Sequence, residues 1–190
     1  MNPVFTLNYP ELLVATYLQQ HFSTKSGYSV LLPLSAQQKG YDLALVRRTA
    51  GATKVVTFQV KSSRTFDGVP GTAARTGQRN FRHYMWLKTF KVPPEADFFV
   101  LIGQYATSPT SLKNTASLWQ SHLLLFTQAE LAGLMPLVRQ KKLNKPDTHF
   151  GFGFDTAKEA FFTRGHVLPQ HPDYSKHLFA SRHAVVQAAL

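Results

Sequence analysis

The chain has 190 residues, of which 44% are hydrophobic and 16% charged, a balance typical of a globular fold with a real core. It contains 21 Lys and Arg against 10 Asp and Glu, which gives a net charge of +11, and no cysteine, which excludes disulfides, thiolate zinc sites and a cysteine nucleophile. The longest apolar runs are far shorter than the ~20 residues that span a bilayer. With no signal peptide pattern at the N-terminus, we expect a cytoplasmic protein with no membrane association.

The first third of the chain predicts one helix and three strands. Asn8 can cap a helix that has Pro10 in its first turn and ends near His21. Strands are predicted over 29–32, 40–46 and 54–62, and the last of these is rich in β-branched and aromatic residues. The short segment around Gly51 predicts a hairpin between the second and third strands.

Further along, residues 64–80 predict a loop and residues 80–90 a helix. Strands are predicted over 97–105 and 118–126, and a capping box at 127–130 opens a helix to about residue 142. A strand over 148–154 and a terminal helix over 174–189 complete the pattern. Together these elements predict a single α/β domain over 1–190: a mixed central sheet with flanking helices, a core of about 8–127 and a C-terminal extension of about 128–190.

The positive charge is unevenly spread along the chain. Residues 61–91 contain a single acid, Asp67, and seven basic residues: Lys61, Arg64, Arg75, Arg79, Arg82, Lys88 and Lys91. A basic face of this kind favours a polyanionic partner, because counterion release supplies much of the affinity for a phosphate backbone. The composition therefore indicates nucleic acid as the partner.

Before Asp67 the chain contains only two acidic residues, Glu11 and Asp42. Carboxylates repel a polyanion unless a divalent cation lies between them. Side chains alternate across a strand, so Gln59 and Lys61 share one face of the third predicted strand, and the hairpin brings Asp42 alongside Gln59. A carboxylate, an amide oxygen and an ammonium would then converge on one spot of the sheet.

This set suits metal-dependent phosphodiester hydrolysis. Mg²⁺ or Mn²⁺ would take the Asp42 carboxylate, the Gln59 side-chain oxygen and the Val60 carbonyl as hard oxygen ligands. Lys61 could orient the attacking water or stabilise developing negative charge. Glu11 could complete the site by holding a metal-bound water or a second metal.

Glu11 on an opening helix, Asp42, and Gln59-Val60-Lys61 resemble the PD-(D/E)xK nuclease superfamily, which includes restriction endonucleases and archaeal Holliday-junction resolvases. The resemblance covers roughly residues 8–127. It implies a restriction-endonuclease-like core (αβββαβ), with Asp42 and Gln59 as metal ligands, Lys61 as the catalytic lysine and Glu11 as the helix carboxylate. The sequence departs from the pattern where Tyr41 stands in place of proline and Gln59 in place of an acid.

Each of these residues also has a purely structural interpretation. Glu11 could close a capping box with Asn8. Asp42 could pair with Arg47 or Arg48 at a strand edge, and Gln59 and Lys61 could lie on the solvent face of an amphipathic strand.

The sequence thus favours a Mg²⁺-dependent endodeoxyribonuclease that acts on double-stranded or branched DNA. The residues expected to contact the DNA are Ser62, Ser63, Arg64, Arg75, Arg79 and Arg82. One site per chain favours a homodimer, with the apolar C-terminal helix as its interface. The alternatives are a catalytically impaired DNA-binding module with a nuclease fold and a structural protein that binds an acidic partner.

Overall fold

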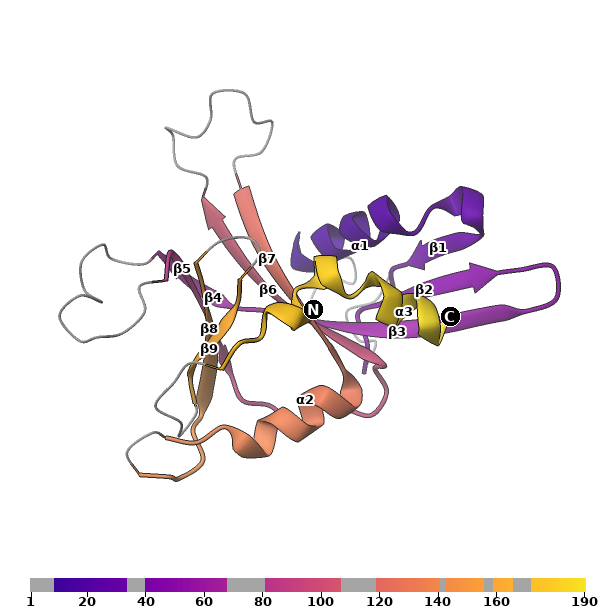
Figure 1. Cartoon of the computed structure of the whole chain (residues 1–190). Coiled ribbons are helices and arrows are strands. Elements are labelled where there is room, and N and C mark those ends of the chain that lie inside the picture. The colour runs from indigo at the N-terminus through magenta and orange to yellow at the C-terminus, as the bar shows by residue number, and fades with distance from the viewer. Residues whose placement is uncertain are drawn as a thin grey trace, which may run out of the picture.

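The computed structural model describes residues 9–33, 40–67, 81–106, 119–140, 143–155, 159–165 and 172–190. These ranges form a mixed α/β fold with two β-sheets, and helices pack on the larger sheet (Figure 1). The three α-helices are α1 (Tyr9–His21), α2 (Gln128–Leu134) and α3 (His183–Ala189), and single 3₁₀ turns lie at η1 (Thr24–Ser26), η3 (Met135–Leu137), η4 (Ser175–His177) and η5 (Phe179–Ser181).

The larger sheet, sheet A, has five strands in the order β1-β2-β3-β6-β7. β1 (Tyr28–Leu31), β2 (Leu43–Arg48) and β3 (Thr53–Ser62) form an antiparallel meander. β6 (Phe98–Ala106) runs parallel to β3, and β7 (Trp119–Thr127) is antiparallel to β6. The initial helix, these five strands and the hairpin between β2 and β3 confirm the predictions for those segments.

The smaller sheet, sheet B, is antiparallel, in the order β4-β5-β8-β9. Its strands are β4 (Arg64–Asp67), β5 (His83–Lys88), β8 (His149–Phe154) and β9 (Phe161–Arg164). Only Ser63 separates β3 from β4, so the chain passes directly from one sheet to the other at that residue.

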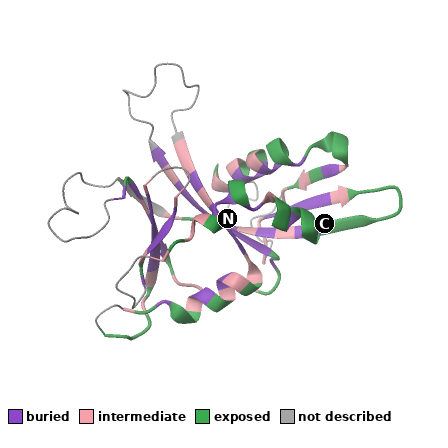
Figure 2. Cartoon of the chain, viewed as in Figure 1, coloured by how far each residue is buried: buried purple, intermediate pink, exposed green. Residues whose placement is uncertain are grey.

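Sheet A has a hydrophobic core on each face. On one face, Val14 and Leu18 of α1 and Val186 of α3 pack against strand residues such as Phe58 and Val100. On the other face, Phe99 and Leu101 of β6 belong to a core shared with α2 and sheet B. Figure 2 shows the buried residues running along the strands of both sheets. Successive side chains of β3 point to opposite faces of sheet A. One face of the strand packs against the α1 core, and the other carries its half-buried polar residues.

The predicted helix over 80–90 is wrong, because His83–Lys88 form strand β5. Side chains along this segment are alternately buried and more exposed, which is the period of a strand. β5 pairs with β8, in which a Cβ at Gly151 or Gly153 would collide with the ring of Trp86 or Phe81. These tertiary contacts with a distant glycine-rich strand override the local helical propensity.

Three other predictions need correction. Residues 64–67 of the expected loop form β4, while 68–80 lie outside the described residues. α2 begins with the predicted capping box but ends at Leu134, since Pro136 lacks the N–H that a continuing helix needs. The expected terminal helix divides into η4, η5 and α3, because Leu178 bridges to Leu124 of β7.

The proposed dimer interface on that terminal segment is largely inside the molecule. Leu178, Phe179, Val186 and Leu190 are buried in the protein's own core, and only Val185 is exposed. These side chains are therefore used for folding and do not form a free apolar face. Within the described ranges, no helix combines the length and apolar composition needed to cross a bilayer.

Candidate functional site

Asp42 immediately precedes β2 and is bound on both sides of Gln59. Its backbone N–H donates to the Phe58 carbonyl at 2.8 Å, and its Oδ2 accepts from the Val60 N–H at 2.7 Å. Phe58 and Val60 flank Gln59 in the strand, so Asp42 lies beside Gln59. The carboxylate takes the place of a backbone acceptor at the point where β2 begins, which fixes its position.

Gln59 and Lys61 lie on the face of β3 that is directed away from α1. Phe58 and Val60 are buried in the α1 core, whereas Gln59 and Lys61 are half-buried on the alternate positions. Gln59 Oε1 is buried, and no described group donates a hydrogen bond to it. Lys61 Nζ lies 5.6 Å from the centroid of the Phe90 ring, so neither side chain is a freely solvated residue of an amphipathic strand.

The Asp42 carboxyl group is partly desolvated. Burial raises the pKa of the Asp42 carboxyl above its usual value, and the Val60 N–H and the Lys61 ammonium only partly oppose that effect. Arg47, an alternative partner in the strand-edge interpretation, instead packs over the Tyr28 ring at 5.4 Å. A partly desolvated carboxylate of this kind gains stability from any further cation placed beside it.

Glu11 belongs to a different layer of the molecule. It lies in the first turn of α1, and that helix packs against the face of sheet A that carries Phe58 and Val60. The structure thus brings Asp42, Gln59 and Lys61 together and places Glu11 on the helix that covers the opposite face. Asn8, the expected capping partner, lies outside the described residues.

The residues expected to contact DNA are only partly described. Ser62 is exposed at the end of β3, and the Ser63 N–H donates to the Ile102 carbonyl at 2.9 Å. Arg82 is exposed just before β5. Arg64 is in β4 but its side chain is not described, and Arg75 and Arg79 lie outside the described residues.

The donor set fits a hard divalent cation of low affinity. The Asp42 carboxylate and the buried, unsatisfied Gln59 oxygen are both ligand types that Mg²⁺ and Mn²⁺ accept. Among the described residues, no group of three or more His, Asp or Glu is arranged to hold a metal ion. The candidate site has one carboxylate and one amide, which leaves it a negative charge short of a site with two acids.

A buried histidine pair was missed by the sequence analysis. His83 Nδ1 of β5 and His122 Nε2 of β7 are 2.8 Å apart, between the two sheets. The His83 ring stacks on Tyr105 and the His122 ring on Phe154. Burial, with smaller contributions from His83 and Arg82, lowers the pKa of His122 to about 4. The two histidines are far apart in the sequence, so no local spacing could have revealed them.

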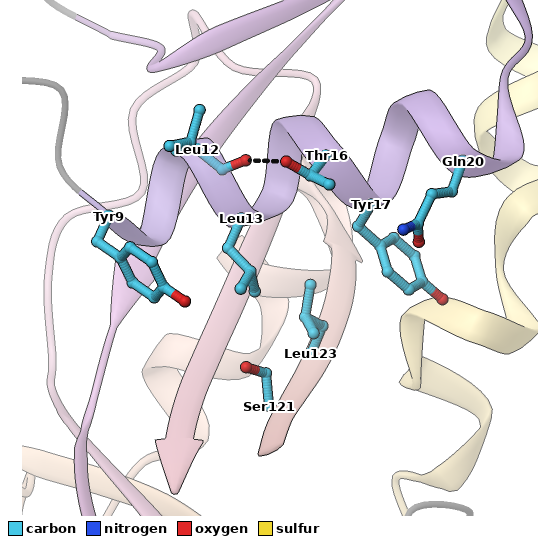
Figure 3. Close-up of a pocket in the computed structure, with 8 residues that line it drawn as sticks. All are labelled: Tyr9, Leu12, Leu13, Thr16, Tyr17, Gln20, Ser121 and Leu123. Atoms are coloured by element: carbon cyan, nitrogen blue, oxygen red, sulfur yellow. Dashed lines mark hydrogen bonds between the residues drawn. The ribbon is translucent and has the colours of Figure 1, made fainter. Parts of the chain in front are cut away.

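A mainly apolar groove lies between α1 and β7 (Figure 3). It has a volume of about 430 Å³, and Tyr9, Leu13 and Tyr17 of the helix lie over Ser121 and Leu123 of the strand. Its described lining residues include no charged side chain, unlike the region around Asp42.

Neither the protein-family models nor the curated proteins that were compared with this chain match it. The functional interpretation consequently depends on the residues and their geometry.

Proposed function

We propose that the protein is a Mg²⁺- or Mn²⁺-dependent endonuclease that hydrolyses phosphodiester bonds in double-stranded or branched DNA. The observation that carries the proposal is the buried Gln59 Oε1, which no described group satisfies, beside the half-buried Asp42 carboxylate. A buried acceptor without a hydrogen-bond donor destabilises the folded protein by about 1–3 kcal/mol. A cation that binds the Gln59 oxygen would explain why this acceptor is kept.

The arrangement of sheet A is consistent with a restriction-endonuclease-like core. An opening helix precedes three antiparallel strands, and a fourth strand, β6, runs parallel to the third. The connection between β3 and β6 contains β4 and β5 where the family pattern has a helix. Support for the resemblance therefore comes from the meander and its candidate site, and the crossover is a departure from it.

Each residue of the site has a role in the proposed reaction. Asp42 and Gln59, with the Val60 carbonyl, would hold the cation, which when bound supplies stabilisation of negative charge on the phosphate. Lys61 would orient the attacking water or stabilise the charge that develops on the phosphate. Phe90 packs against the Lys61 ammonium and limits its freedom.

The net charge of +11 supports a DNA partner, because phosphate contacts to Lys and Arg provide most of the sequence-independent affinity. Cleavage of both strands with one site per chain favours a homodimer. Glu11 remains a proposed supporting carboxylate, although the helix that carries it covers the opposite face of sheet A.

The second candidate function is a DNA-binding module that keeps the nuclease fold but does not cleave. The neutral Gln59 favours it, because a site with one carboxylate binds a hard cation weakly. The two functions share the fold and the basic surface and differ only in cleavage.

A cleavage assay separates the two functions. Plasmid and branched DNA would be incubated with the protein and Mg²⁺, Mn²⁺ or EDTA, and DNA binding measured in parallel by fluorescence anisotropy. We expect metal-dependent cleavage that Asp42→Asn abolishes while binding is retained, with Glu159→Gln as the matched control. Binding without cleavage in either metal would support the module, and absence of DNA binding would contradict both functions.

A further inference from the structure

A second pocket lies where the C-terminal end of α1, the η1 turn, β2 and α3 meet. It has a volume of about 560 Å³, and its polar lining consists of His21, Ser23, Ser26, Arg47, His183 and Gln187. Every one of these side chains can donate a hydrogen bond. Among the described residues, no acid lines the pocket, in contrast with the Asp42 site on the other side of sheet A.

The surrounding sequence is also free of acids. The sequence around the lining residues contains no Asp or Glu over positions 12–41, 43–66 and 174–190. They do contain Lys25, which lies in η1 between the lining residues Ser23 and Ser26. A pocket in such a region has a positive potential that no carboxylate side chain of these segments offsets.

The walls of the pocket are held in place by contacts within the chain. Arg47 is opposite Tyr28 in the β1–β2 ladder, and its guanidinium packs over the Tyr28 ring at 5.4 Å. The His21 and His183 rings stack with their centroids 3.9 Å apart. The Arg48 N–H donates to the Gly27 carbonyl at 2.9 Å, which ties the η1 turn to the end of β2.

Two polar atoms of these walls have no hydrogen-bond partner among the described residues. Arg47 Nε and His183 Nε2 are both buried, and no described group forms a hydrogen bond with either atom. The Arg47 guanidinium and the Ser23 and Ser26 hydroxyls, which line the pocket, would donate hydrogen bonds to an anion bound there. Arginine and hydroxyl donors suit the several acceptor oxygens of a phosphate group.

We propose that this pocket is a binding site for a phosphate group. Its volume leaves room for the organic part of a phosphoester beside the phosphate. Arg47 lies in β2, five residues after Asp42, which at the rise of a strand is roughly 17 Å, so the pocket is separate from the candidate catalytic site. The phosphate could come from a small phosphoester or from a DNA backbone, and only the second source rests on the proposed nuclease function.

Calorimetry tests the site with two probes, inorganic phosphate and a short DNA duplex, on the full chain. Arg47→Gln removes the central donor, and Arg48→Gln is the matched control because Arg48 is exposed and does not line the pocket. We expect Arg47→Gln to weaken phosphate binding by roughly tenfold or more and Arg48→Gln to leave it unchanged. Ser26→Ala provides a second, milder variant that leaves the Tyr28 contact intact, and it should weaken binding in the same direction.

The outcomes separate the sources of the phosphate. Loss of affinity in Arg47→Gln for inorganic phosphate alone supports a small phosphoester, and loss for both probes supports a DNA phosphate. Equal weakening by Arg47→Gln and Arg48→Gln would point to diffuse surface charge and overturn the proposal. So would the absence of phosphate binding to the wild-type protein. Because cleavage is not measured, failure of the nuclease function leaves the phosphate test intact.

Discussion

Two of the places where the described part of the molecule buries polar side chains differ in how those groups are satisfied. Between the sheets, His83 and His122 form a hydrogen bond with each other at 2.8 Å, and both rings stack on aromatic neighbours. On β3, the Gln59 oxygen is buried and no described group satisfies it, beside the Asp42 carboxylate. The first arrangement is complete within the chain, as a structural pair should be. The second is incomplete, as expected of a site that takes a ligand.

The largest expected effect is at the incomplete site. Lys61→Ala should reduce DNA cleavage by roughly 10²–10⁴-fold, because Lys61 is the cation beside Asp42 that would act on the reacting water or phosphate. DNA binding should remain close to wild type, since Lys61 is one positive charge among many. Lys54→Ala, at an exposed position of the same strand, is the matched control. Steady-state cleavage and anisotropy measure the two properties, and unchanged cleavage in Lys61→Ala would place the activity elsewhere.

The histidine pair should control stability at acidic pH. The pKa of His122 is about 4 in the folded protein, below its ordinary value of 6.5, so the folded state holds the neutral ring. Between pH 6.5 and about 4, the His122 ring is protonated in the unfolded chain but stays neutral in the folded protein. The stabilising contribution is therefore complete above pH 6.5 and is lost as the pH falls from 6.5 through 4. The contribution lost is on the order of 3 kcal/mol. Urea unfolding across this range, compared with His122→Leu, measures it, and an equal pH slope in the variant would contradict the assignment.

Leucine substitutions at His122 and Gln59 should have different effects on the free energy of unfolding. His122→Leu should destabilise the protein by about 1–3 kcal/mol, because His83 loses its buried partner. Gln59→Leu should leave stability equal or higher, because it removes a buried oxygen that no described group satisfies. Chemical unfolding of the metal-free variants measures both free energies. A comparable loss of stability in Gln59→Leu would show that Gln59 has a structural role.

The smallest effect concerns metal affinity. Gln59→Glu should bind Mg²⁺ roughly tenfold more tightly than wild type, because the site gains the negative charge that a hard cation prefers. Calorimetry of Mg²⁺ binding to the folded variant tests this, with Gln20→Glu on the exposed side of α1 as control. Equal or weaker binding in Gln59→Glu would mean that Gln59 does not face the metal.

The sequence by itself predicted the elements whose signals are local. The opening helix, the β2–β3 hairpin, the apolar strand β6 and the Thr127–Glu130 capping box depend on contacts between near neighbours, and the structure confirms them. The proximity of Asp42 to Gln59 followed from strand alternation and hairpin pairing, which are also short-range. Whether this site holds a metal and cleaves DNA stays a prediction.

Only the tertiary structure decided which elements form sheet B and which polar groups meet across it. The prediction of a helix at β5 is wrong because the strand depends on pairing with β8. In β8, Gly151 and Gly153 leave room for the rings of Trp86 and Phe81. The His83–His122 pair and the Arg47 pocket join residues that are distant in the sequence. Residues that meet through long-range pairing have no characteristic separation in the sequence. Which residues meet is determined by the packing of the sheets, and local sequence patterns do not contain that information.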